Sequence, residues 1–71
     1  MDRMALVQHL VGAEDDVASA ARAIIRHQEL ILDLERDGHD AGEAERLLAK
    51  FGKVLKLHVA DRDTCRKLFA R

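Results

Sequence analysis

His58 is the side chain of this chain whose type and spacing most readily suggest chemistry. His58 and Asp61 are three residues apart, which places both on the same side of a helix. Glu14, from the first half of the chain, would join them if the two halves packed side by side. Imidazole and carboxylate groups bind divalent metals, and helical bundles hold such sites between facing helices. The chain lacks, however, a Glu followed by a His three residues later, the pattern of di-iron bundles.

His58 also has explanations that need no metal. Its ring could lie at the edge of the core, hydrogen-bonded to Gln28, Asp61 or a second chain, or form a packing contact that responds to pH. Glu14 and Arg62 are expected within one turn of each other, so we predict an ion pair that aligns the two halves of the chain. Metal binding by His58, Asp61 and Glu14 is therefore a secondary hypothesis, and we expect no bound metal or cofactor.

The other histidines and the cysteine suggest no catalytic chemistry. We expect His9, His27 and His39 on helix flanks or in a turn, exposed to solvent, with His27 as the candidate if a histidine accepts phosphate. Cys65, the single cysteine, is expected as a small buried packing residue without a neighbouring His or Lys that would lower its pKa. The chain has no Gly-rich phosphate loop and no nucleophile motif, so we do not expect an enzyme.

Charge is divided unevenly along the chain. Residues 1–43 carry four basic and ten acidic side chains, residues 44–71 carry eight basic and three acidic ones, and the net charge is −1. The basic ridge of the second half consists of Arg46, Lys50, Lys53, Lys56, Lys67 and Arg71. We expect this ridge to complement the acidic first half. Nucleic-acid binding is a weaker alternative, because the net charge is not basic and exposed aromatic residues are not expected.

The elements that must position these side chains are helices. The chain has no proline and two aromatic residues, a composition that favours helix, and its apolar residues recur at steps of three, four and seven. The first apolar stripe consists of Val7, Leu10, Val11, Val17, Ala18, Ala21, Ile24, Ile25, Ile31 and Leu32. The second consists of Ala44, Leu47, Leu48, Phe51, Val54, Leu55, His58, Cys65 and Phe69. We therefore predict two amphipathic helices.

One short connection joins these helices. The predicted elements are a helix over about residues 3–36, a turn over 37–40 and a helix over about 41–70, in one domain spanning residues 1–71. Gly38 is expected to end the first helix in a left-handed conformation, and Asp40 with Glu43 has the pattern of a capping box. Gly12 is expected to leave the first helix unbroken, because the stripe keeps its phase there.

So short a connection predicts an all-α, antiparallel two-helix hairpin. The expected alignment places Gln28 beside Phe51, Ala21 beside His58, Val17 beside Arg62 and Glu14 beside Cys65. Each stripe is too wide for one neighbouring helix to cover, so we expect two copies to form a four-helix bundle. The residues expected in the core or the dimer interface are Leu10, Val17, Ala21, Ile24, Ile31, Leu48, Phe51, Leu55 and Phe69.

Two segments of the chain carry a family resemblance. The sequence is LERDGHD at residues 34–40 and LHVADRD at residues 57–63. With the leucine-rich segment between them, these segments resemble small helical-hairpin proteins that are common in alphaproteobacteria and have no established activity. The resemblance covers about residues 24–63. It implies a bacterial, cytosolic hairpin and identifies no site residue.

The sequence therefore predicts a small homodimeric helical scaffold or adaptor that acts through protein–protein interaction. The alternatives are a metal- or ligand-binding bundle centred on His58 and a nucleic-acid-associated accessory protein that uses the basic ridge. We expect a cytoplasmic location, because the lone cysteine suits a reducing compartment and no segment has the character of a signal peptide or a membrane span.

Overall fold

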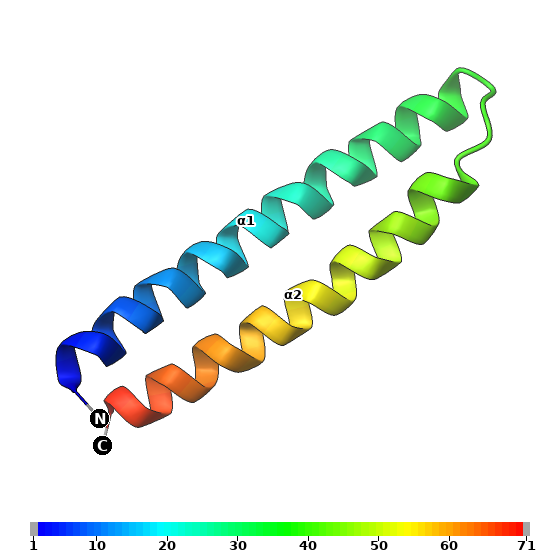
Figure 1. Ribbon diagram of the computed structural model, residues 1–71. Coiled ribbons are helices and arrows are strands. Elements are labelled where there is room, and N and C mark those ends of the chain that lie inside the picture. Colours follow the sequence, from blue (N-terminus) through cyan, green and yellow to red (C-terminus); the bar gives the residue numbers. More distant parts are fainter. Residues whose placement is uncertain (1, 71) are drawn as a thin grey trace.

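Two long helices run antiparallel along the whole length of the molecule (Figure 1). The computed structural model describes residues 2–70, in which α1 spans Arg3–Arg36 and α2 spans Gly42–Phe69. The molecule measures 54 × 14 × 14 Å. The start of α1 and the end of α2 lie side by side, at the end of the molecule opposite the turn. Residues 2–70 form no strand. The predicted all-α hairpin is therefore confirmed.

Helix α1 begins at a side-chain cap. The backbone N–H of Met4 donates a hydrogen bond to Oδ1 of Asp2, at 3.1 Å, which satisfies one of the free N–H groups at the start of the helix. The helix then continues through Gly12 without interruption. At the same end of the molecule, the Arg3 guanidinium lies 4.5 Å from the centre of the Phe69 ring, which links the first turn of α1 to the last turn of α2.

The turn has the hydrogen bonds of a Schellman motif. Gly38 has φ +79°, a left-handed conformation that glycine adopts without strain. The N–H of His39 bonds to the Leu34 carbonyl at 2.8 Å, and the N–H of Gly38 bonds to the Glu35 carbonyl at 3.1 Å. These bonds satisfy carbonyl groups that the end of a helix leaves free.

Helix α2 begins one residue later than predicted, and the predicted capping box does not form. Oδ1 of Asp40 accepts a hydrogen bond from the Gly42 N–H at 2.9 Å, so its carboxylate closes a local turn before the helix. The cap residue is Ala41, which has no side-chain oxygen to offer. Glu43 and Glu45 lie in the first turn, where negative charge is favourable near the free N–H groups.

The faces along which the helices meet show a regular spacing. Covered residues alternate at steps of three and four, the spacing of a coiled-coil seam. On α1 this inner seam consists of Leu6, Leu10, Ala13, Val17, Ala20, Ile24, His27, Ile31 and Leu34. It continues through Ala41 and α2 as Ala44, Leu48, Phe51, Leu55, His58, Arg62, Cys65 and Phe69. Among residues 2–70, the apolar side chains with least exposure are Ala13, Ile31, Ala41 and Cys65.

The predicted stripes are wider than the inner seam. All nine residues expected in the core or the dimer interface are at least half-buried within the hairpin. Four members of the first predicted stripe instead face solvent, namely Val11, Ala18, Ile25 and Leu32. The prediction placed these side chains together with the inner seam, but a single neighbouring helix covers only the seam itself. No helix within residues 2–70 is both long enough and apolar enough to cross a bilayer.

Candidate functional site

A cluster of three potential ligand side chains joins the two helices near their open end. His9 comes from α1, whereas Asp61 and Cys65 are one turn apart on α2. Nε2 of His9 lies 3.2 Å from Oδ1 of Asp61, and one ligand atom from each of the three residues lies within 4.8 Å of the others. The histidine and the carboxylate are exposed, while the thiol is buried in the inner seam. The cluster therefore combines nitrogen, oxygen and sulfur donors.

The thiol of this cluster is free and is held in its neutral form. Burial raises the pKa of Cys65, and the negative charge of Asp61 raises it further. A thiol with a raised pKa is a poor nucleophile at neutral pH, because the thiolate is the reactive species. The predicted burial of Cys65 is confirmed; a ring nitrogen of His9 lies within 4.8 Å of the thiol, but the pKa of the thiol is raised and not lowered.

The three predicted metal candidates do not come together in this hairpin. Nδ1 of His58 lies 3.8 Å from Oδ2 of Asp16, at the flank of the inner seam. Asp61 instead pairs with His9, and Glu14 pairs with Arg66. His58, Asp61 and Glu14 are thus divided among three separate contacts, because Glu14 and Asp61 pair along different edges of the inner seam.

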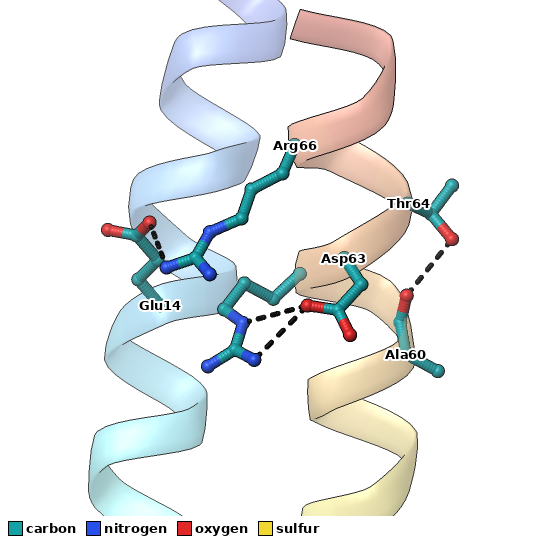
Figure 2. A network of polar contacts seen from close by, with 6 residues as sticks. Glu14, Ala60, Asp63, Thr64 and Arg66 are labelled. Atoms are coloured by element: carbon teal, nitrogen blue, oxygen red, sulfur yellow. Dashed lines mark hydrogen bonds and ion pairs between the residues drawn. The ribbon is translucent and has the colours of Figure 1, made fainter. Parts of the chain in front are cut away.

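The predicted ion pair between Glu14 and Arg62 is replaced by two other contacts. Nη2 of Arg66, one turn further along α2, donates to Oε1 of Glu14 at 3.2 Å (Figure 2). Arg62 is half-buried, and its guanidinium donates to Oδ1 of Asp63 at 3.2 Å from Nε and 3.1 Å from Nη2. In the same region the Thr64 hydroxyl donates to the backbone carbonyl one turn earlier, also shown in Figure 2.

His27 belongs to the inner seam, so its predicted exposure to solvent is wrong. Its ring meets the edge of Phe51 in a T-shaped contact, with 5.1 Å between ring centres. Nε2 of His27 is buried and has no hydrogen-bond partner among the residues that the structure describes. This packing argues against His27 as a phosphate acceptor. His9 and His39 are exposed, as expected.

The basic ridge lies on the outside of α2. Its members Arg46, Lys50, Lys53, Lys56 and Lys67 are all exposed, and Arg71 lies outside the described residues. Between the described parts of the two helices, the ion pairs involve His9, Glu14 and His58 and none of these ridge residues. The described members of the ridge therefore form no ion pair with the acidic helix within one chain, and their charges face solvent.

Large apolar side chains also face solvent, and they are not scattered. Eight of the nine large exposed hydrophobic residues in the described chain fall on two lines. We call Met4, Val11, Ala18, Ile25 and Leu32 the outer α1 stripe. We call Leu47, Val54, Leu57 and Leu68 the outer α2 stripe. Such continuous apolar surface is typical of interaction sites.

The two outer stripes lie on opposite faces of the hairpin. The outer α1 stripe flanks Glu14, which pairs with Arg66 along one edge of the inner seam. The outer α2 stripe flanks Asp61, which pairs with His9 along the other edge. His9 and Glu14 are five residues apart and so point about 140° apart around the helix axis. One face is thus apolar along α1, and the opposite face is apolar along α2.

Residues 2–70 enclose no pocket that could hold a small-molecule substrate. The features of the described chain that remain to be interpreted are its surfaces and the ligand cluster at the seam edge. These features have to be interpreted from the side chains themselves, since no protein-family model, no curated protein and no solved structure matches this chain.

Proposed function

We propose that this chain is a cytoplasmic helical scaffold or adaptor without enzymatic activity, which works as a homodimeric four-helix bundle. The observation that carries the proposal is the outer α1 stripe, whose large side chains are more than half exposed in the single hairpin. Water contact with this much apolar surface is unfavourable by about 25 cal/mol per Å². A second copy that covers the stripe removes that cost.

The hairpin exposes more surface than a compact monomer of its mass, which supports the proposed dimer. The chain exposes 5385 Å² at a mass of 8.0 kDa, whereas a compact monomer of that mass exposes about 4,450 Å². The excess of about 900 Å² is close to the area that each subunit contributes to a stable interface, about 800 Å². An elongated hairpin of two helices reaches the normal ratio of surface to mass when a second hairpin packs against it.

The spacing of the outer α1 stripe suits a two-fold axis at its centre. Its members are seven residues apart and are distributed evenly on both sides of Ala18. An antiparallel partner would bring Met4 opposite Leu32 of the second copy and Val11 opposite Ile25 of the second copy. The small side chain of Ala18 allows close approach at the axis. The interface is then self-complementary, as two-fold symmetry requires.

Charges beside this stripe are compatible with the same arrangement. Asp15 and Arg22 lie three residues before and four residues after Ala18, and both are exposed. A two-fold axis near Ala18 brings the aspartate of one copy close to the arginine of the other. Rim pairs of this kind fix the orientation of an interface more than they strengthen it. By contrast, Lys50 and Asp61 interrupt the outer α2 stripe, so we assign the dimer to the α1 side.

Dimerisation on the side of the outer α1 stripe leaves the opposite face of each hairpin available, which carries the outer α2 stripe. The basic ridge and the outer α2 stripe would then appear twice, once on each side of the bundle. An apolar line beside lysines suits a partner helix that has both apolar and acidic residues. The proposed scaffold activity is to hold two such partner segments at a fixed separation.

Sedimentation equilibrium of the Ile25→Lys variant tests the dimer. Ile25 is 54% exposed in the hairpin, so the substitution should leave the single hairpin folded. In the dimer it would bury an unpaired charge, which costs about 3 kcal/mol or more and weakens association more than a hundredfold. We expect a helical monomer by circular dichroism and sedimentation.

The matched control is Leu47→Lys on the outer α2 stripe, where the exposed fraction is 41%. Glu43 lies four residues earlier on the same helix and can pair with the new lysine. This variant should remain dimeric. A parent chain that stays monomeric at 100 µM, or an Ile25→Lys variant as dimeric as the parent, would overturn the proposal.

A further inference from the structure

The cluster of His9, Asp61 and Cys65 has the donor set of a transition-metal site. Thiolate and imidazole together select zinc-like ions over magnesium or calcium, and a carboxylate completes three ligands. We infer that these three side chains bind one zinc ion per chain at the edge of the inner seam. This inference concerns a site that the proposed scaffold function does not use.

The distances require only small adjustments. Zinc bonds of about 2.0–2.3 Å in a tetrahedron separate ligand atoms by about 3.3–3.8 Å. Nε2 of His9 is already 3.2 Å from Oδ1 of Asp61, and Sγ of Cys65 lies within 4.8 Å of one ring nitrogen of His9 and one carboxylate oxygen of Asp61. His9 and Asp61 are exposed and can change rotamer, whereas the backbone spacing of Asp61 and Cys65 is set by one turn of α2. The cysteine thus serves as a fixed point at which the other two ligands converge.

The local charges also suit a divalent cation. A thiolate and a carboxylate together balance the two charges of zinc, and the thiol proton is released to water when the metal binds. The nearby arginines do not neutralise Asp61, because Arg62 pairs with Asp63 and Arg66 pairs with Glu14. Asp61 pairs instead with His9, which remains a ligand when neutral.

The position of the cluster leaves one coordination site open and keeps the metal away from the dimer interface. Zinc prefers four ligands, and since His9 and Asp61 face solvent the fourth ligand is water. The cluster lies on the edge of the seam opposite the Glu14–Arg66 pair, and hence opposite the outer α1 stripe. Metal binding and dimerisation can therefore be tested separately.

Cobalt substitution is the most direct test of the site. Chelator-treated full-length protein is titrated with Co²⁺, and a thiolate ligand gives a sulfur-to-cobalt charge-transfer absorption that saturates at one ion per chain. Competition with a chromophoric chelator then gives the zinc affinity. We expect the charge-transfer band to be absent in Cys65→Ser, and the zinc affinity to fall at least about tenfold in His9→Gln and in Asp61→Asn.

Two matched controls separate this site from other histidines. His39→Gln alters an exposed turn histidine, and His58→Gln alters the histidine beside Asp16; neither should change the affinity. His9 is exposed, so His9→Gln should keep the hairpin folded even if the Cys65 variant does not. Absence of the thiolate band in the parent, or equal zinc affinity in parent and His9→Gln, would overturn the inference. The oligomeric state of His9→Gln should match that of the parent.

Discussion

At the scale of single residues, the buried thiol of Cys65 makes the stability of the fold depend on pH. Burial, and then the charge of Asp61, raises the pKa of its thiol, so the folded chain keeps this proton to higher pH than the unfolded chain does. The contribution to stability is therefore fully present below the ordinary thiol pKa of about 8.5 and is lost as pH rises through the raised value.

This dependence can be measured by urea unfolding between pH 7 and pH 10 in the presence of a chelator. The parent should lose more stability over this range than Cys65→Ala, which has no thiol to ionise. Both chains share every other titrating group, so the difference isolates the cysteine. Parallel declines in the two chains would contradict the assigned shift of the Cys65 pKa.

The burial of a single residue was easier to predict from the sequence than the residues it contacts. The burial of Cys65 was predictable, because its position continues the apolar spacing of α2. The contact of His9 with Asp61 and Cys65 was not predictable, because the expected alignment placed His9 opposite residue 70. His27 carried a usable signal: it is three residues after Ile24 and four before Ile31, which places it in the inner seam.

At the scale of the helices, two glycines should respond in opposite directions to the same substitution. Gly12 is inside α1, and a Cβ atom there would meet no other atom within 4 Å. Gly12→Ala should therefore stabilise the fold by about 1 kcal/mol, through the higher helix propensity of alanine. Gly38 has φ +79°, so Gly38→Ala should destabilise by about 1–2 kcal/mol.

Thermal unfolding of the two variants beside the parent provides the measurement. Each variant is the control of the other, since both add one methyl group without creating a contact. A Gly38→Ala variant as stable as the parent would show that the left-handed turn does not persist in solution. Destabilisation by Gly12→Ala would show that another chain approaches α1 at that point.

The existence of the helices and the position of the turn followed from apolar spacing and from Gly38, and both are confirmed. The sides of each helix were harder to assign. The first predicted stripe superimposes two sets of positions, of which Ile24 represents the inner seam and Ile25 the outer α1 stripe. Hydropathy alone cannot separate adjacent sets, because both are apolar. The inner seam follows alternating steps of three and four residues. Once one residue is known to contact the other helix, this alternation identifies the rest of the seam and so separates it from the outer α1 stripe.

At the scale of the whole molecule, the hairpin is a rod 54 Å long with a thin core. The inner seam supplies the contacts that hold α1 against α2, but most of its side chains are only half covered. A chain of this size with no internal disulfide gains little stability from such a core alone. The outer α1 stripe offers the additional burial, so folding and association should be coupled in the proposed dimer.

Coupled folding and association predict a melting temperature that depends on protein concentration. A hundredfold increase, from 5 to 500 µM, should stabilise a dimer by about 2.7 kcal/mol through mass action. With an unfolding entropy of about 2.1 cal/mol/K per residue, that corresponds to a rise in Tm of roughly 10 °C. The Ile25→Lys variant should melt at a lower temperature that is the same at both concentrations. A parent Tm that is constant over this range would mean that the single hairpin is the stable unit and that its outer stripes await a different partner.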